Sequence, residues 1–238
     1  MKRQRCRCKV FSAHLSAFSL VGIWGSIELE DRCVLFFIKN PQKAKVKTRL
    51  ASAIGDKMAV KLYKRFLLEM LSTLNRGTFL FYLCFHPEDS LKDLKNWLGE
   101  DYLYIPQIGE NLAEKMKNAF IEAFSMKFKR VLLIGSDIPD LPLEFIDEAF
   151  KSLDEKDAVI GPSVDGGYYL IGFRDKTFLP RAFEKIPWST ERVFDETMKV
   201  LENQKLTVHT LQPLRDIDTA KDLTIRGFPL PSPRRGEG

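Results

Sequence analysis

Three aspartates combine residue type and position in a way that suits metal chemistry: Asp137, Asp216 and Asp218. Asp137 comes soon after the apolar run 131–134, which is typical of a buried strand. Asp216 and Asp218 are one residue apart, so an extended segment would present both on the same face. Hard divalent cations take oxygen ligands and also bridge phosphate groups. We therefore expect Asp137 to hold Mg²⁺ or Mn²⁺, with Asp216 and Asp218 as candidates to complete the site.

Helix capping is the alternative role for these aspartates, because Asp and Thr side chains accept hydrogen bonds from the free N–H groups of a first helical turn. Asp140, shortly before Pro142, fits the capping of the next helix better than Asp137 does. This comparison favours a ligand role for Asp137. Asp218 or Thr219 could cap the last predicted helix, so the role of the second pair stays open.

A basic loop follows the first predicted strand and carries five cations in eleven residues: Lys39, Lys43, Lys45, Lys47 and Arg49. Lysine supplies a mobile point charge, and arginine a planar fork that matches phosphate oxygens. Such a loop can hold a diphosphate, or it can be an ordinary solvated basic loop. The spacing alone does not decide between the two interpretations.

Two further segments contain residue types found at ligand sites. Gly166 and Gly167 follow Asp165, and adjacent glycines permit either close approach of the backbone to a ligand or a tight hairpin turn. From the residues alone, the turn is the favoured interpretation. In the second segment, Trp188 could stack on a substrate but more often such a residue fills the core. Ser189 or Thr190, which follow it, would cap the next helix.

Other chemistries are not indicated. The three histidines (His14, His86 and His209) are scattered, and the four cysteines fit neither a zinc site nor a disulfide framework, which favours a reducing cytoplasm. The net charge of +5 comes largely from the two ends of the chain. We therefore expect no nucleic-acid surface.

The predicted elements alternate between strands and helices, which indicates one Rossmann-like α/β domain with a mostly parallel sheet and helices on both faces. In such sheets ligands bind beyond the carboxyl ends of the strands, where the segments described above would meet. The predicted strands are 34–38, 78–85, 102–105, 131–134, 158–160, 168–173 and 206–211. The predicted helices are 56–74, 87–98, 111–124, 143–153, 190–203 and 219–225.

We expect the folded domain to span residues 32–226, between an extension at 1–31 and a disordered tail at 227–238 that is rich in Pro, Gly and Arg. Residues 1–31 place basic side chains before an apolar stretch. Three interpretations fit: a leader outside the fold, such as one from a misassigned start codon, a membrane-surface anchor, or an export signal. Any membrane contact would be made through this extension.

Five segments, taken together and in order, resemble one bacterial family, DUF2064, described as arsenosugar-biosynthesis-type glycosyltransferases related to the GT-A-like nucleotide-diphospho-sugar transferases. The matching segments are 39–50, 135–139, 161–170, 187–190 and 216–219. The resemblance runs from about Cys33 to Leu223. It departs from the family pattern at Ala44, where the family usually has Gly, and a positive φ there would strain the loop.

The resemblance implies a GT-A fold and a metal-dependent transfer of a glycosyl group from a nucleotide-diphospho-sugar donor to a small-molecule acceptor. Asp137 would hold the divalent ion against the donor's two phosphates, with Asp216 and Asp218 as further ligand candidates. Asp165 would orient a substrate or act as general base. The donor phosphates would be bound by Lys39, Lys47 and Arg49, and the substrates by Gly166, Gly167, Trp188, Ser189 and Thr190.

Two rival functions remain. Nucleotidyltransferases of the molybdopterin and phospholactate type share this fold and a metal-holding aspartate, and release pyrophosphate from a nucleoside triphosphate. They usually open with a glycine-rich loop, which the basic loop of this chain lacks. The other rival is a non-catalytic nucleotide-binding protein or a membrane-surface adaptor. The sequence leaves open the base, the sugar, the acceptor, the stereochemistry and the oligomeric state.

Overall fold

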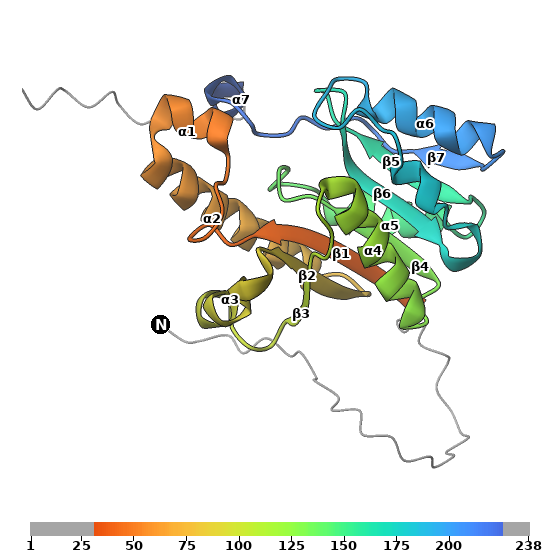
Figure 1. The fold of residues 1–238 in the computed structure, drawn as a ribbon, viewed down its shortest axis with the longest axis horizontal. Helices are drawn as coiled ribbons and strands as arrows, with labels where there is room; N and C mark the ends of the chain where they lie inside the picture. Colours follow the sequence, from red (N-terminus) through yellow and green to blue (C-terminus); the bar gives the residue numbers. More distant parts are fainter. Residues whose placement is uncertain (1–30, 226–238) are drawn as a thin grey trace, which may run out of the picture.

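The computed structural model describes residues 31–225, and these form a single sheet between two layers of helices (Figure 1). Within this range the sheet has seven strands in the order β3-β2-β1-β4-β6-β5-β7. Only β6 runs antiparallel to its neighbours, β4 and β5, which confirms the predicted α/β fold with a mostly parallel sheet. The strands are β1 (Arg32–Lys39), β2 (Leu80–His86), β3 (Leu103–Pro106), β4 (Arg130–Ile134), β5 (Ala158–Pro162), β6 (Tyr168–Arg174) and β7 (Val208–Thr210).

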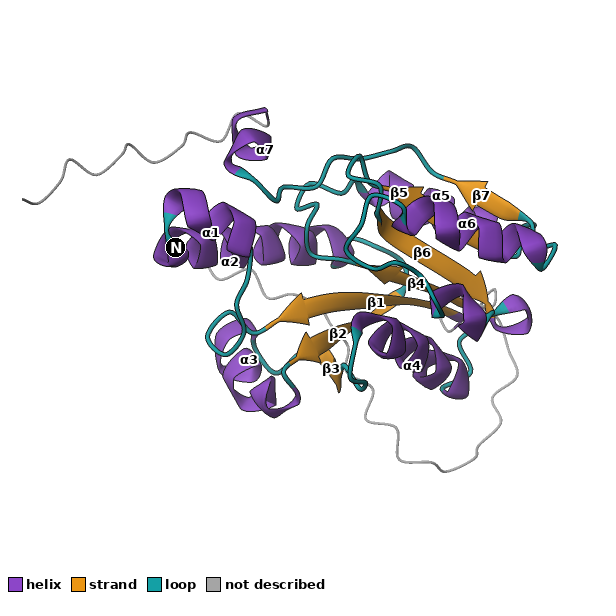
Figure 2. Ribbon diagram, turned by 45° about the horizontal axis from the view of Figure 1, so that its top comes forward, coloured by secondary structure: helices purple, strands orange, loops and turns teal. Residues whose placement is uncertain are grey.

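Helices cover both faces of the sheet (Figure 2). Two hydrophobic clusters fill the space between the sheet and these helices. The first packs α2, α3 and α5 on one face of the sheet, and the second packs α4 and α6 on the other. The helices are α1 (Thr48–Ile54), α2 (Asp56–Leu74), α3 (Leu91–Leu98), α4 (Leu112–Ser125), α5 (Leu143–Ser152), α6 (Val193–Asn203) and α7 (Ala220–Ile225). Short 3₁₀ turns occupy residues 88–90, 175–177 and 180–183.

The central strand β1 is buried on both faces, which explains its continuous apolar run. Phe36 and Ile38 point into the cluster under α2, whereas Leu35 and Phe37 point into the cluster under α4. This alternation continues to the end of the strand, so Lys39 shares a face with Phe37. The strand therefore carries its last side chain to the α4 side of the sheet edge.

A third, smaller cluster joins segments that are far apart in the sequence. Leu50 of α1 and Phe66 of α2 pack against Ile217 and against Leu223 of α7. All four side chains are almost fully buried. This packing holds the segment before α7 against the loop that follows β1.

Helix α1 was not predicted, and two of its residues fall in what we expected to be a basic loop. Of its seven residues, only Leu50 is buried, so the sequence shows no amphipathic period. By contrast, the predicted range 56–74 coincides with α2, whose apolar side chains recur at three- and four-residue steps over 19 residues.

The capping predictions were wrong for two helices and right for one. Pro142, rather than Asp140, occupies the N-cap position of α5. Helix α6 begins at Val193 rather than near Thr190, whose hydroxyl accepts a hydrogen bond from the Arg192 amide before the helix starts. Before α7, Thr219 and Asp222 exchange side-chain-to-backbone hydrogen bonds in a capping box.

The predicted extensions lie outside the described residues, except for Asp31, which pairs with Arg130 and Lys129. No helix within residues 31–225 is both long and apolar enough to cross a membrane.

Gly172 in β6 provides a test of the packing at the centre of the sheet. An added Cβ there would lie 2.3 Å from Leu132 Cδ2 and 2.9 Å from Val159 Cγ1. We predict that Gly172→Ala lowers the free energy of unfolding by about 1–3 kcal/mol, because the neighbouring strands must shift. Urea denaturation measures the change. Gly135→Ala, where an added Cβ meets nothing within 4 Å, is the control and should change it by less than about 0.5 kcal/mol. Equal losses in both variants would contradict the packing argument.

Candidate active site

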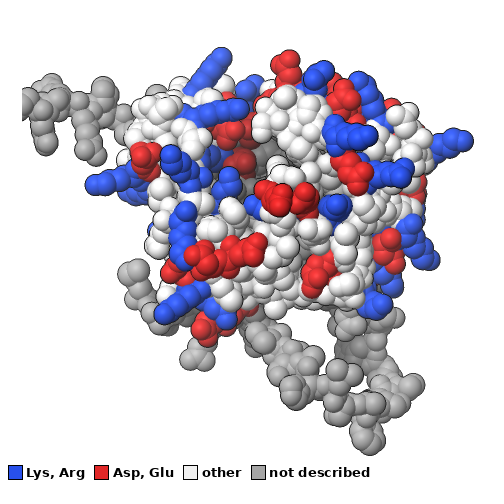
Figure 3. Space-filling model, viewed as in Figure 1, with Lys and Arg blue, Asp and Glu red and all other residues white. Residues whose placement is uncertain are grey.

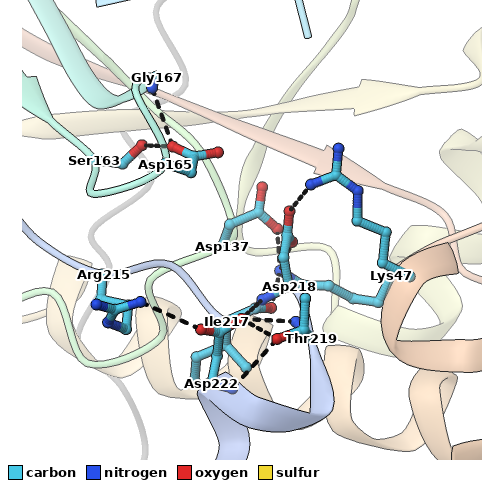
Figure 4. A network of polar contacts seen from close by, with 11 residues as sticks. Lys47, Asp137, Ser163, Asp165, Gly167, Arg215, Ile217, Asp218, Thr219 and Asp222 are labelled. Carbon is cyan, nitrogen blue, oxygen red and sulfur yellow. Dashed lines mark hydrogen bonds and ion pairs between the residues drawn. The ribbon is translucent and has the colours of Figure 1, made fainter. Parts of the chain in front are cut away.

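The Lys47 ammonium lies between two carboxylates at the carboxyl edge of the sheet (Figure 4). Its Nζ is 2.5 Å from Asp137 Oδ1 and 3.0 Å from Asp218 Oδ1, and it donates to the Ile217 carbonyl at 2.6 Å. The side chain is only 2% exposed. Burial would lower the pKa of Lys47, but the two carboxylates outweigh it and hold the pKa above its ordinary value. Lys47 is therefore a permanent buried cation.

The backbone around Lys47 explains how a loop lysine reaches this position. Lys47 is the N-cap of α1 and adopts a left-handed conformation with φ of 48°. This conformation costs a non-glycine residue roughly 1 kcal/mol. The three contacts of the ammonium stabilise it. Ile217 completes the link, because its amide donates to the Asp137 carbonyl at 3.0 Å while its side chain packs in the third cluster.

Ala44, the departure from the family pattern, does not strain the loop. It is not among the described residues with positive φ, and its amide donates to the Asn40 carbonyl at 2.9 Å. The left-handed residue of this loop is Lys47 instead.

Arg49 stands at the same site but remains at the surface. Its Nη1 is 3.8 Å from Asp218 Oδ2, and its side chain is 68% exposed. A loose contact of this kind leaves most guanidinium donors accessible to a bound anion.

The other cations of the basic loop do not join Lys47. Lys43 pairs with Asp89 at 2.9 Å and with Asp93 at 3.2 Å. Lys39 is exposed and stands opposite His86 in the register of β1 and β2. The predicted five-cation loop thus divides, and only Lys47 and Arg49 reach the aspartates.

A second acidic turn faces the Lys47 group. Asp165 Oδ1 accepts hydrogen bonds from the Gly167 amide at 3.0 Å and from the Ser163 hydroxyl, which closes the turn between β5 and β6. The Val164 amide donates to the Leu214 carbonyl at 3.0 Å and so fixes this turn beside the segment that carries Asp216. In Figure 4 the Asp137 side chain lies between the Asp165 turn and the Asp218–Lys47 pair.

The pKa of Asp216 reflects both its burial and the negative charges around it. Burial, followed by the charges of Asp165, Asp218 and Asp137, raises its pKa to about 6 from an ordinary 3.8. Four carboxylates therefore converge here, and Lys47 and Arg49 balance only part of their charge. The space-filling view shows a hollow beside α1 with acidic atoms on its wall (Figure 3).

The carboxylates suit a divalent cation in chemistry but do not form a complete shell. Among residues 31–225, no group of three or more His, Cys, Asp or Glu side chains has the geometry of a metal site. Lys47 stands between Asp137 and Asp218. Mg²⁺ commonly takes one or two carboxylates and completes its shell with phosphate oxygens and water. Burial and the neighbouring carboxylates raise the pKa of Asp216, and the negative charge of those carboxylates fits such a partly protein-bound ion.

Gly166 and Gly167 form the predicted hairpin turn. Gly166 has φ of 89°, and an added Cβ would lie 2.0 Å from the Glu191 carbonyl oxygen. Its own carbonyl accepts from the Phe194 amide at 2.9 Å, so the turn packs against the start of α6. Gly166 is therefore required for packing, whatever it does for a ligand.

Trp188 is half-buried and packs on the core under α4, with its ring edge-to-face against Tyr168 at 6.2 Å. This supports the interpretation of Trp188 as a core residue. Ser189 and Thr190, which follow it, are exposed.

Tyr63 is a site residue that our sequence analysis did not identify; it lies within the predicted helix 56–74. Its hydroxyl accepts from the Lys39 amide at 2.8 Å and from the Ser136 hydroxyl at 3.4 Å. It thereby joins the ends of β1 and β4 beneath Asp137. Burial raises the pKa of Tyr63 to about 12. The sequence does contain one sign of this role: Tyr63 places a hydroxyl among the apolar residues that face the core from α2.

The fold belongs to the class of α/β domains seen in nucleotide-diphospho-sugar transferases. A protein of Desulfovibrio desulfuricans G20, provisionally named a nucleotide-diphospho-sugar transferase, is 39% identical with a TM-score of 0.80, over 87% of this chain and 92% of its own. Residues 70–190 match the family described as "Uncharacterized protein conserved in bacteria (DUF2064)". The chain belongs to this family.

More distant structures share the fold alone. The 4-diphosphocytidyl-2C-methyl-D-erythritol synthase of Anaerococcus prevotii DSM 20548 is 14% identical with a TM-score of 0.56, over 84% of this chain and 95% of its own. Among curated proteins no match was found.

Lys47 can be tested through stability. We predict that Lys47→Met lowers the free energy of unfolding by about 2 kcal/mol, because Asp137 and Asp218 lose the ammonium between them. The loss is smaller than for a fully buried ion pair, because both carboxylates are partly exposed. Arg49→Gln should change it by less than about 0.5 kcal/mol. Urea denaturation of both variants measures these changes in the free energy of unfolding. A Lys47→Met protein as stable as Arg49→Gln would contradict the assignment.

Asp216 provides a pH-dependent test. Its native pKa, about 6, exceeds the ordinary 3.8, so between these values the native state binds more protons and stability falls as pH rises. Asp216→Asn removes this penalty. We predict that it stabilises metal-free protein by on the order of 1 kcal/mol at about pH 8 and much less at about pH 4. Asp147→Asn, at an exposed position of α5, is the control for urea denaturation across pH. A gain independent of pH would refute the charge argument.

Proposed function

We propose that the protein transfers a glycosyl group from a nucleotide-diphospho-sugar to a small-molecule acceptor with the help of Mg²⁺ or Mn²⁺. The observation that carries the proposal is the buried Lys47 between Asp137 and Asp218, with Arg49 beside them, at the carboxyl edge of the sheet. Ligands of open α/β sheets bind at this edge. The name and the 39% identity of the Desulfovibrio relative support the same donor class.

The two cations suit a diphosphate leaving group. Negative charge grows on the nucleoside diphosphate as the glycosidic bond breaks, and fixed positive charge stabilises it most at that stage. Lys47 supplies a charge that is already oriented by its three contacts. Arg49 supplies an exposed guanidinium able to contact two phosphate oxygens.

The aspartates would hold the ion. The Asp137 side chain is 54% exposed, so it remains accessible despite its contact with Lys47. Asp137, with Asp216 or Asp218, would supply the protein ligands, and the bound ion would neutralise the diphosphate as a Lewis acid.

Asp165 would contact a substrate directly. Both hydrogen bonds of the turn are made to Oδ1, and Figure 4 shows its other oxygen directed away from the turn. That oxygen could orient a hydroxyl or accept its proton. Gly166, Gly167, Trp188, Ser189 and Thr190 are the proposed substrate-side residues. We retain the cytoplasm as the expected location; both described cysteines, Cys33 and Cys84, are buried free thiols.

The products released distinguish the proposal from its rivals. The full chain is incubated with Mn²⁺ and either a panel of nucleotide sugars or the four nucleoside triphosphates. We expect nucleoside diphosphate from at least one nucleotide sugar. Pyrophosphate from a triphosphate would instead establish a nucleotidyltransferase, whose fold this chain shares. Binding of nucleotides, measured by thermal shift, without either product would favour a non-catalytic protein.

Asp137 should be essential for that turnover. We predict that Asp137→Asn lowers kcat/KM for nucleoside diphosphate release by about 100-fold or more, because it removes a ligand of the ion that neutralises the leaving group. Asp147→Asn, the same substitution at an exposed position of α5, should leave the rate unchanged. Full activity of Asp137→Asn at saturating Mn²⁺ would refute the metal assignment.

A further inference from the structure

A second group of basic side chains lies along the same sheet edge. Lys39 ends β1, His86 ends β2, and the register places them opposite each other. Lys115, in the first turns of α4, approaches His86 with Nζ 3.3 Å from Nδ1. Cys84, two residues before His86, belongs to the core under α4, so all three side chains stand on the α4 side. We call Lys39, His86 and Lys115 the basic triad.

The protein supplies little negative charge to this triad. Within residues 31–225, neither Lys39 nor Lys115 forms an ion pair, in contrast to Lys43 and Lys47. Burial and the charges of Lys115 and Lys39 lower the pKa of His86, and Glu88 opposes this only as the smallest contribution. The positive charges of Lys39 and Lys115 therefore act on His86 with only a small opposing contribution from Glu88.

The hydrogen bond to Lys115 orients the imidazole. An ammonium can only donate, so Nδ1 of neutral His86 must accept, and the ring proton is then on Nε2. The triad therefore combines an imidazole N–H donor with the Lys115 ammonium beside it and with Lys39 on the neighbouring strand. This arrangement suits a phosphate or carboxylate better than a neutral hydroxyl.

The triad adjoins the acidic cluster but is separate from it. Tyr63 Oη accepts from both the Lys39 amide and the Ser136 hydroxyl, so Lys39 stands close to the residue that precedes Asp137. Lys47 and Arg49 contact Asp218, whereas neither Lys39 nor Lys115 forms an ion pair within residues 31–225. Two anionic groups could therefore bind side by side along the edge.

We propose that Lys39, His86 and Lys115 bind a phosphate or carboxylate group of the second substrate, distinct from the donor diphosphate. The identification with a second substrate rests on the proposed function; the anion site itself does not. Under this proposal the acceptor is an anionic small molecule. Lys39 would bind that acceptor, whereas Lys47 belongs to the donor side of the site.

Inorganic phosphate is the probe. NMR of the His86 imidazole, assigned with His86→Gln, is followed during phosphate titration of the full chain at constant ionic strength. We expect a saturable shift and a phosphate-dependent rise in the pKa of His86, since an anion favours the charged imidazole. The absence of a saturable shift would overturn the proposal.

Two matched variants test which charges matter. Lys115→Gln should weaken phosphate binding about three- to tenfold, whereas Lys117→Gln, on the same helix with the same change in net charge, should leave it within about twofold. Equal weakening by both would indicate general attraction by a basic surface and overturn the site. Lys39→Gln should reproduce the effect of Lys115→Gln; unchanged binding would remove Lys39 from the site.

A competition arm identifies the source of the anion. The titration is repeated with a saturating mixture of ADP, CDP, GDP and UDP in the presence of Mg²⁺. Retained phosphate binding supports a separate second-substrate site, and competitive loss would assign the triad to the donor diphosphate and overturn the proposal. Because no step requires turnover, a failure of the glycosyltransferase assay would be visible independently of these results.

Discussion

The contact on which the site depends is that of the Lys47 ammonium with Asp137, Asp218 and the Ile217 carbonyl. These groups come from the loop after β1, the loop after β4 and the segment before α7, and a single buried charge joins them. Like-charged carboxylates would otherwise repel one another, and burial together with this repulsion raises the pKa of Asp216. The same lysine thus ties the three segments together at the edge where ligands of such sheets bind.

The sheet edge around this lysine is electrically divided. Carboxylates gather beyond β4, β5 and the segment before α7, whereas Lys39, His86 and Lys115 stand beyond β1 and β2. Tyr63 joins the two halves through its hydroxyl. An edge with adjoining acidic and basic groups suits a cation together with two anionic groups, in keeping with the proposed metal-assisted transfer.

Periodicity predicted most of the fold because its elements are long or strongly apolar. Helix α2 was predicted with its observed bounds, whereas α1 escaped because Leu50 alone marks its buried side. The sequence also predicted that Asp137, Lys47 and Asp218 would lie at one edge, since the carboxyl ends of parallel strands meet there. It could not show that Lys47 would enter between the carboxylates, because this depends on a left-handed backbone and on packing between Leu50 and Ile217, distant in the chain. Nor could it distinguish the hydroxyl of Tyr63 from the rest of an apolar stripe.

Paramagnetic broadening by Mn²⁺ tests the central claim most directly. Mn²⁺ is added with a nucleoside diphosphate to labelled full-length protein, and the loss of backbone amide signals is mapped by NMR. The account predicts that broadening centres on Asp137, Gly167 and Asp218 and extends to Lys47. Broadening centred elsewhere, for example on the groove lined by Ile105, Ile108 and Ile121 between β3 and α4, would contradict it.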